Sequence, residues 1–330
     1  MTETGVESLV RQLSDGRFHS GESLARLLGV SRTAVWKGMQ KISRETGLEI
    51  HAVRGRGYRL ALPLELLDAD RIASYIRSGS SVVPEIRVHA SLPSTSNYLA
   101  ERMGELADNT LCFAEHQTAG RGRRGRQWIS PYGTNLYFSL YRRFPLGMQE
   151  LAGLSLAVGA VVAETLSRYF DGISLKWPND LLVDGRKLAG ILVDVHGQAE
   201  GPVDTVIGIG LNLRMPQLSG DEIDQPWIDL ESVAGREISR NLLAAELSLA
   251  LLEALDSFSG SRLSAWMESW RRYDNWHGRP VQLVRGERVI SGIHAGVAND
   301  GSLRLEIDGR VEHFHSGEVS LREGVSCERV

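Results

Sequence analysis

The sequence has few cysteines and no long hydrophobic segment. Its 330 residues include two cysteines, Cys112 and Cys327, which are too few for a disulfide framework. Cys112 lies in an apolar run, where we expect a small buried side chain. The longest uncharged apolar run, residues 151–163, is shorter than the about 20 residues that a helix needs to span a bilayer. Residues 1–16 carry charges throughout and lack the apolar segment of a signal peptide. We therefore expect a cytoplasmic protein that does not enter a membrane.

The sequence also has no strong excess of either charge. The net charge is −4, but residues 1–66 hold 10 Lys and Arg against 7 Asp and Glu, a balance of +3, which leaves −7 for the remainder. This asymmetry permits a nucleic-acid-binding domain at the amino terminus. The length corresponds to two or three domains, and 42% hydrophobic residues are enough to form their cores.

Residues 6–60 have the pattern of a winged helix-turn-helix. After two short helices, a third is expected to begin at the N-cap Ser31 and to end at Gly47, and two short strands should follow around a basic hairpin tip. The outward side chains of the third helix and of the tip combine phosphate-binding and base-reading groups. These candidate DNA-binding residues are Ser31, Arg32, Thr33, Trp36, Lys37, Gln40, Arg54 and Arg56. The alternative is a small helical domain whose basic residues only solvate its surface.

A loop rich in glycine and arginine, residues 120–126, reads Gly-Arg-Gly-Arg-Arg-Gly-Arg. Backbone N–H groups and guanidinium groups in such a loop suit a phosphate or a carboxylate. The pattern G-x-G-x-x-G would indicate a dinucleotide site, but an aromatic-rich strand at 135–141 follows it instead of a helix. The spacing of a phosphate loop is also present, but Arg126-Gln127 stands where Lys-Ser/Thr is required. We predict an anion-binding loop between two strands; the alternative is a solvated basic turn.

The middle of the chain contains further candidate ligand residues. The Ser-Thr-Ser sequence at 94–96 precedes a short helix, where its hydroxyl groups either cap the helix or bind a ligand. The Asp184-Gly185 turn predicts a hairpin that places Lys187 at the start of the returning strand. Gly190 has no side chain, so a ligand could approach the backbone of this strand closely. A lysine in this place is also compatible with an ordinary solvent-facing edge residue.

The last part of the chain is expected to form a flap and then a small β domain. Residues 215–230 include two prolines, acidic residues and Trp227, which favours a mobile flap over a packed element. From residue 279 onward, short alternating strands separated by turns predict a small antiparallel barrel. His313 and His315 share a strand face there, but the sequence offers no third ligand, so we expect no metal site.

Three motifs together resemble those of the bifunctional bacterial biotin protein ligases that also repress the biotin biosynthesis operon. They are residues 120–126, Lys-Trp-Pro-Asn-Asp at 176–180 and Arg-Lys-Leu-Ala-Gly-Ile-Leu at 186–192, and they occur in the family's order and approximate spacing. The resemblance covers nearly the full chain. It implies an α/β (α+β) multidomain fold: a winged helix-turn-helix domain at 1–66, a mixed-sheet catalytic domain of the biotin/lipoate ligase type at 67–276, and an SH3-like barrel at 277–330.

The resemblance implies a two-step ligase reaction. The carboxylate of biotin attacks the α-phosphate of ATP, which is supplied with Mg²⁺, to give biotinyl-5′-adenylate and pyrophosphate. A specific lysine of the biotin carboxyl carrier protein of acetyl-CoA carboxylase then attacks the mixed anhydride. Fixed cations are the main physical requirement, because anions are brought together and charge develops on phosphorus. The catalytic residues implied are Lys187, Arg121, Arg123 and Asp180, with Asp180 orienting or deprotonating the incoming lysine.

The resemblance also implies which residues bind the ligand. Ser94, Thr95 and Gln117 would hold the biotin rings, and Asn212 and Trp227 would flank the adenine. The full implied set for biotin or the adenylate is Ser94, Thr95, Ser96, Gln117, Gly120, Arg121, Gly122, Arg123, Lys187, Gly190, Asn212 and Trp227. The family often has Asn where this chain has Ser96, so we expect weaker or rearranged contacts at that position.

For regulation, the resemblance implies that the adenylate is also the corepressor. Its binding would order the 120–126 loop and the flap, and an ordered sheet edge would then pair in a homodimer that reads a palindromic operator of the biotin operon. Two other interpretations remain open: a biotin-sensing transcription factor without catalysis, and a lipoate-type ligase. Lys187 and Asp180 argue against the first, and the amino-terminal domain and the 176–180 motif argue against the second.

Overall fold

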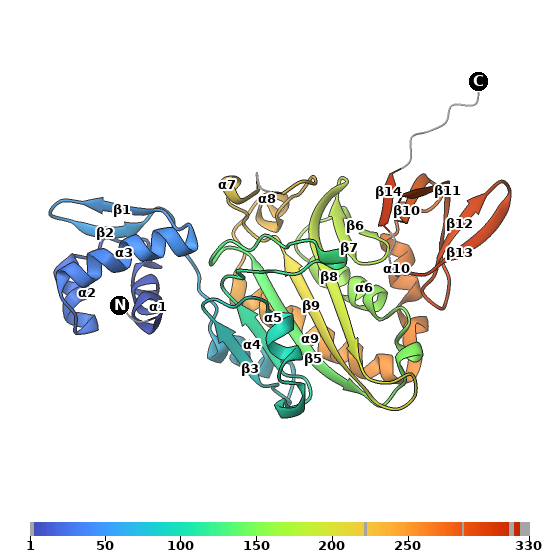
Figure 1. Ribbon diagram of the computed structural model, residues 1–330, viewed down its shortest axis with the longest axis horizontal. Coiled ribbons are helices and arrows are strands. Elements are labelled where there is room, and N and C mark those ends of the chain that lie inside the picture. The colour runs from blue at the N-terminus through green and yellow to red at the C-terminus, as the bar shows by residue number, and fades with distance from the viewer. Residues whose placement is uncertain (1–2, 221–222, 286, 317–319, 324–330) are drawn as a thin grey trace, which may run out of the picture.

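A computed structural model describes residues 3–220, 223–285, 287–316 and 320–323 of the chain. Along the chain it contains a small helical domain with a two-stranded wing, a large central domain and a carboxy-terminal β domain, and the first and the last lie at opposite ends of the molecule (Figure 1). Cys112 is fully buried, as expected, and Cys327 lies outside the described residues.

The amino-terminal domain is a helix-turn-helix with a wing, as predicted. Its elements are α1 (Glu3–Leu13), α2 (Gly21–Leu28), α3 (Arg32–Thr46), β1 (Ile50–Val53) and β2 (Gly57–Leu60). The Ser31 hydroxyl caps α3 by accepting a hydrogen bond from the backbone N–H of Ala34 at 3.1 Å. Gly47 ends α3 with a φ of 71°, a left-handed conformation that glycine adopts without steric cost. Val35 and Ile42 of α3 are fully buried against the other two helices, so the inward stripe of the helix forms the core.

The central domain is built on a seven-stranded mixed sheet in the order β3-β4-β5-β9-β8-β7-β6. β3 and β4 are parallel, and all other neighbouring strands are antiparallel. The strands are β3 (Ile86–His89), β4 (Leu111–Ala114), β5 (Leu136–Phe144), β6 (Ile173–Lys176), β7 (Asp180–Val183), β8 (Arg186–His196) and β9 (Val203–Leu211). The predicted hairpin joins β7 to β8, with φ values of 49° at Asp184 and 74° at Gly185. Positive φ at both positions is typical of the tight turn that this dipeptide favours.

Helices cover one face of the sheet and leave part of the other face for a ligand. The covering helices are α4 (Ala69–Gly79), α6 (Leu154–Leu166), α9 (Arg240–Ser261) and α10 (Met267–Tyr273). Alternation along β9 explains the division, because Ile207 and Ile209 are buried in the helix-covered core while Gly208 and Gly210 point to the opposite face. The short helix α5 (Thr95–Ala100) packs on that opposite face.

Among the described residues, the segment Met148–Leu166 is apolar enough to cross a membrane by length and composition alone, with a mean hydropathy of 1.2. It is 67% buried inside the domain, which is typical of a core helix. A 3-10 turn at Met148–Leu151 precedes α6, and Gly153 lies between them with a φ of 80°. A Cβ at Gly153 would lie 2.5 Å from the Leu263 side chain, so the helix breaks where close packing requires glycine.

The carboxy-terminal domain is an antiparallel sheet in the order β13-β12-β11-β10-β14, which confirms the predicted antiparallel domain. Its strands are β10 (Pro280–Arg285), β11 (Arg288–Val297), β12 (Leu303–Ile307), β13 (Arg310–Phe314) and β14 (Ser320–Glu323). The indole N–H of Trp177 donates a hydrogen bond of 3.1 Å to the carbonyl oxygen of Gly301. This bond fixes the 176–180 motif of the catalytic domain against the carboxy-terminal domain.

Candidate functional site

A pocket of about 410 Å³ opens on the face of the sheet that carries α5. Its floor includes Gly190 of β8 and Gly210 of β9, which lie opposite each other in the sheet register, and Gly208. The absence of side chains at these positions leaves the backbone accessible to a neighbouring group. The structure brings together in the pocket wall Ser94, Thr95, Ser96, Gln117, Arg121, Gly122, Arg123, Asp180, Lys187, Gly190, Asn212 and Trp227.

Gly120 is the one sequence candidate for ligand binding that the structure places inside the loop and not among the wall residues. A Cβ at Gly120 would lie 2.4 Å from the carbonyl oxygen of Trp128 and 2.9 Å from the Ser130 hydroxyl. The backbone N–H of Trp128 also donates a hydrogen bond of 2.9 Å to the Gly120 carbonyl. Glycine at this position is therefore required for the loop to close on itself.

One end of the pocket is a cluster of buried hydroxyl and amide groups. Ser94 caps α5, with its hydroxyl accepting from the Asn97 N–H at 3.4 Å, whereas the next two side chains turn inward. The hydroxyls of Thr95 and Ser96 lie 2.8 and 2.9 Å from that of Ser139 on β5. The Gln117 side-chain oxygen accepts from the backbone N–H of Thr95 at 2.9 Å. The structure thus shows the capping alternative at Ser94, and it places the hydroxyls of Thr95 and Ser96 in the pocket wall.

The arginine–glycine loop lies between β4 and β5, as predicted, and contributes guanidinium groups to the wall. Arg121 donates hydrogen bonds of 2.8 Å to the Asn97 side-chain oxygen and to Asp194. Arg123 donates to the side-chain oxygen of Asn179 at 3.2 Å and to the carbonyl oxygen of Ser316 in the carboxy-terminal domain. Burial lowers the pKa of Arg123 from its usual value. These bonds attach the loop to the rest of the catalytic domain and to the carboxy-terminal domain.

Lys187 and Asp180 form an ion pair across the β7–β8 hairpin. The Lys187 Nζ lies 2.8 Å from Asp180 Oδ1, and the two side chains are only 15% and 16% exposed. The register of this hairpin shifts between Leu181 and Leu182, and such a bulge re-aims the neighbouring side chains. The lysine is therefore not a solvent-facing edge residue, which was the alternative interpretation.

The wall of the pocket is rich in positive charge. Burial lowers the pKa of Lys176, Asp180 opposes this, and the nearby cations Lys187 and Arg126 lower it further. Cationic side chains outnumber carboxylates among the lining residues, so a bound anion would be stabilised by more than one fixed charge. The cationic lining residues are Arg121, Arg123, Arg124, Arg126, Lys176 and Lys187.

Trp128 is the main site residue that the sequence did not single out. A Cβ at Gly210 would lie 2.4 Å from the Trp128 ring, and one at Gly190 would lie 3.0 Å from it, so the indole lies against the glycine floor. The Lys187 Nζ lies 5.3 Å from the centre of the same ring. In the part of the chain that the structure describes, the buried indole N–H of Trp128 has no hydrogen-bond partner. The only sequence signal is its position directly after the arginine–glycine loop.

The flap is packed at its base, which differs from the mobile segment that we expected. Met215 and Ile228 are buried, and Trp227 pairs with Lys187 in an isolated parallel bridge. The indole N–H of Trp227 donates 3.0 Å to the carbonyl oxygen of Gly220. Asn212 donates through Nδ2 to the carbonyl oxygens of Lys187 and Ile228, both at 3.2 Å. These bonds leave the buried Asn212 Oδ1 without a hydrogen-bond partner among the described residues and available to a ligand.

The DNA-binding candidates form a separate surface on the amino-terminal domain. Along α3, the side chains of Thr33, Trp36, Lys37 and Gln40 are exposed, with Trp36 at 52%. Two candidates make contacts within the domain, because Arg32 pairs with Glu22 and Arg56 lies 4.2 Å from the centre of the Phe18 ring. The remaining candidates are Ser31, which caps α3, and Arg54, which is exposed at the tip of the wing.

Comparisons with known proteins assign a family or domain type to each of the three parts of the chain. The model of the biotin/lipoate A/B protein ligase family matches residues 88–212, a helix-turn-helix domain model matches 6–59, and the biotin protein ligase C-terminal domain model matches 277–322. The chain is 45% identical over 324 residues to the bifunctional ligase/repressor BirA of Salmonella typhimurium, with 98% of this chain and 99% of that protein aligned.

Two further comparisons agree with this match. The BirA of Escherichia coli is 42% identical, with 95% of this chain and 96% of that protein covered. The structure of the Aquifex aeolicus biotin protein ligase in complex with biotin and ATP is similar with a TM-score of 0.62 and 27% identity. The alignment covers 73% of this chain and 99% of that one.

Proposed function

The chain belongs to the family of bifunctional biotin ligase/repressors, and from that membership we propose how its residues divide the work. The protein is a biotin–protein ligase that uses biotin and ATP and carries a DNA-binding repressor domain. The domain limits that we propose are 1–66 for DNA binding, 67–276 for catalysis and 277–330 for the carboxy-terminal domain. The observation that carries the catalytic proposal is the largely buried Lys187–Asp180 pair in a cation-rich pocket.

In the first step, an oxygen of the biotin carboxylate forms a bond to the α-phosphorus of ATP, and the bond to the bridging oxygen breaks to release pyrophosphate. We assign the cations around the pocket to this step, because negative charge on the transferring phosphoryl group must be held by fixed positive groups. Lys187 contacts the junction of carboxylate and phosphate, and Arg121 and Arg123 hold the loop around it. The Trp128 ring limits the access of water to the same region.

The two ends of the pocket suit the two ends of the adenylate. The hydroxyl and amide cluster of Ser94, Thr95, Ser96 and Gln117 offers donors and acceptors for the polar ureido ring of biotin. At the other end, the unpartnered Asn212 Oδ1 and the Trp227 indole are suited to the adenosine. Ser96 lines the pocket, and the hydrogen bond of 2.9 Å between its hydroxyl and that of Ser139 fixes its orientation.

In the second step, the amine of a carrier-protein lysine attacks the carbonyl carbon of the mixed anhydride, and AMP leaves. The attacking amine must lose a proton, and Asp180 is the carboxylate in the wall closest to Lys187. We assign Asp180 the role of orienting this amine and accepting its proton. The acceptor protein is the biotin carboxyl carrier protein of acetyl-CoA carboxylase.

Mg²⁺ fits this site as a companion of ATP and not as a resident metal. Among the described residues, no group of three or more His, Cys, Asp or Glu is placed to hold a metal, and Asp180 is already paired with Lys187. Mg²⁺ binds through phosphate oxygens and water with few protein ligands, which agrees with this donor set. When bound with ATP, it supplies positive charge to the phosphates.

For regulation, we propose that the adenylate orders the arginine–glycine loop and the flap, and that the ordered catalytic domain then forms a homodimer through a sheet edge. The dimer presents two copies of α3 and the wing to the two halves of a palindromic operator. Ligand binding and dimerisation are thermodynamically coupled in this scheme, so each strengthens the other by the same factor.

One experiment tests the enzymatic assignment directly. The purified protein is incubated with biotin, Mg-ATP and an apo carrier domain, and the carrier is analysed by mass spectrometry for biotin on one lysine. A lipoate-type ligase would leave the carrier unmodified in this mixture and would modify it in a parallel incubation in which lipoate replaces biotin. A sensor without catalysis would bind biotin but give no modified carrier and no biotin-dependent exchange of pyrophosphate into ATP.

A further inference from the structure

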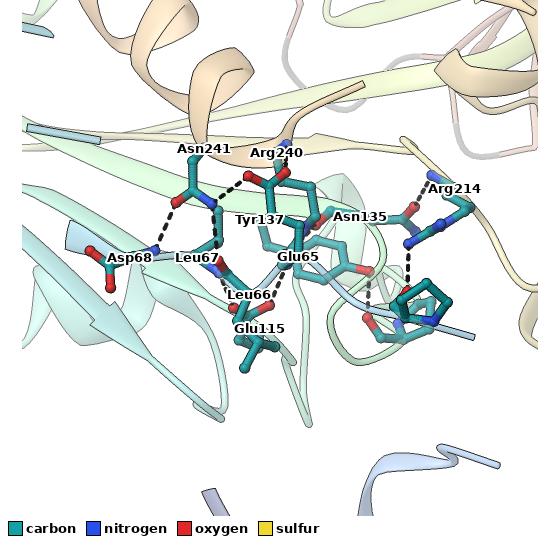
Figure 2. A network of polar contacts seen from close by, with 12 residues as sticks. Glu65, Leu66, Leu67, Asp68, Glu115, Asn135, Tyr137, Arg214, Arg240 and Asn241 are labelled. Atoms are coloured by element: carbon teal, nitrogen blue, oxygen red, sulfur yellow. Dashed lines mark hydrogen bonds and ion pairs between the residues drawn. The ribbon is translucent and has the colours of Figure 1, made fainter. Parts of the chain in front are cut away.

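The linker between the DNA-binding and catalytic domains, residues 61–68, is held by the amino-terminal end of α9 (Figure 2). The Glu65 carboxylate accepts hydrogen bonds from the Arg240 backbone N–H at 2.6 Å and from the Ser239 hydroxyl at 2.9 Å. Burial opposes the ionisation of Glu65, but bonds from Asn241, Ser239 and Arg240 outweigh it, so its pKa is lowered. The Asn241 side chain also bonds to Leu66 and Asp68. The linker is thus a fixed part of the catalytic domain surface.

Arg240 connects the linker to the sheet. Its side chain is 2% exposed, and a buried guanidinium requires partners for its donors. It donates to the carbonyl oxygen of Glu65 at 2.8 Å, to Glu115 at 2.6 Å and, through two nitrogens, to the carbonyl oxygen of Asn135 at 2.7 and 3.2 Å. One side chain therefore fixes the linker, the end of β4 and the start of β5 in a single arrangement.

Asn135 continues this connection to the root of the flap, residues 213–215. Its side-chain oxygen accepts from the backbone N–H groups of Leu213 at 2.9 Å and Arg214 at 3.1 Å, and its amide nitrogen contacts the Met215 sulfur at 3.4 Å. Arg214 also reaches the linker directly, with its guanidinium 3.4 Å from the carbonyl oxygen of Pro63. Two routes thus join the linker to the flap root, one buried and one at the surface.

The flap in turn is paired with the backbone of the proposed catalytic lysine. The N–H of Lys187 donates to the carbonyl oxygen of Pro226 at 2.8 Å, and the N–H of Ile228 donates to the carbonyl oxygen of Lys187 at 3.0 Å. The flap root begins one residue after Asn212, whose side-chain amide donates to the carbonyl oxygens of Lys187 and Ile228. A shift of the root is therefore transmitted to Asn212 and Trp227, which line the pocket.

We propose that Arg214, Asn135 and Arg240 are positioning residues that set the ATP side of the pocket according to the docking of the linker. They do not line the pocket themselves. The inference rests on the proposed assignment of Asn212 and Trp227 to the adenosine. It links the DNA-binding domain to nucleotide affinity within one subunit, without any second copy of the chain.

The test uses the full-length protein and biotin-dependent exchange of pyrophosphate into ATP. Arg214→Met removes the direct contact with Pro63 and also the ion pair with Glu231 at 3.8 Å. The matched control is Arg236→Met, because Arg236 is exposed and its guanidinium lies 5.2 Å from the centre of the Tyr169 ring. We expect Arg214→Met to raise the KM for ATP about threefold to tenfold, as the loss of one hydrogen bond to a charged group allows. The KM for biotin should change less than twofold, and Arg236→Met should change neither constant.

The linker side is tested with Glu65→Ala, alone and combined with Arg214→Met. Glu65→Ala should also raise the KM for ATP, and the double variant should be no worse than the poorer single variant, because both act on one element. Arg214→Lys should recover part of the affinity. An unchanged KM for ATP in Arg214→Met, or strictly additive effects in the double variant, would overturn the inference. If the unmodified protein shows no biotin-dependent exchange of pyrophosphate into ATP, the proposed function itself would be refuted.

Discussion

Replacement of Lys187 by alanine gives the sharpest test of the proposed chemistry. The Lys187 side chain is 15% exposed and its Nζ lies 2.8 Å from Asp180 Oδ1, so it is a fixed and largely buried charge. Removal of one such preorganised group typically lowers kcat by about 10²- to 10³-fold, or about 3–4 kcal/mol in the barrier. We therefore expect biotin-dependent exchange of pyrophosphate into ATP to fall by at least about 10²-fold. An exchange rate within threefold of the unmodified protein would refute the assignment of Lys187 to the first step.

The partner of the ion pair supplies the matched control. Asp180→Asn keeps the shape of the side chain but removes the carboxylate, which a proton acceptor for the second step requires. General-base contributions are typically about 10²- to 10⁴-fold, so transfer from preformed adenylate to the carrier lysine should slow by about 10²-fold or more. Exchange should fall less than tenfold, because the cations remain. If Asp180→Asn slows exchange as strongly as Lys187→Ala, then Asp180 acts only by holding Lys187.

Three further predictions concern the domains and the pH dependence. Trp36→Ala or Lys37→Ala should weaken operator binding while biotinylation continues, and operator affinity should fall steeply with salt; binding that is insensitive to salt would contradict a phosphate-anchored surface. Deletion of residues 1–62 should leave measurable ligase activity in the carrier assay, and complete loss would show that the domains do not separate there. Burial lowers the pKa of His116 below its usual value near 6.5, so the unfolded chain binds the proton more readily and stability is lost as pH falls below about 6.5. The decrease in Tm between pH 7.5 and 5.5 should be smaller in His116→Gln, and an equal decrease would assign the effect to other groups.

Local sequence signals predicted the elements whose geometry depends on one or two residues. Ser31 and Gly47 bound α3 because an N-cap hydroxyl and a left-handed glycine act within a single turn. The Asp184-Gly185 sequence predicted the hairpin turn, and the hairpin predicted that Lys187 lies at the start of the returning strand. The three motifs carried the family resemblance, and the relatives and family models confirm it.

The sequence could not provide the contacts that depend on distant parts of the chain. Alternation along β5 places Ser139 on one face of the sheet, but not next to Thr95 and Ser96, which come from a helix more than 40 residues earlier. Trp128 follows the arginine–glycine loop, but only the folded loop brings its ring onto Gly210. The polar composition of the flap suggested mobility, whereas Asn135 and the backbone of Lys187 hold its base. The burial of Arg240 could not be predicted from the sequence, because an arginine at the start of a helix is usually exposed.

The fixed linker has a consequence for how the protein measures distance on DNA. A flexible tether would let two reading helices adapt to operators with different half-site spacings. In this chain, however, bonds from Glu65 and Asp68 to the start of α9 hold the second half of the linker. In the homodimer that we propose, the separation of the two α3 helices would therefore be set by the contact between the catalytic domains. An operator lengthened by half a helical turn should lose affinity even when both half-sites are intact.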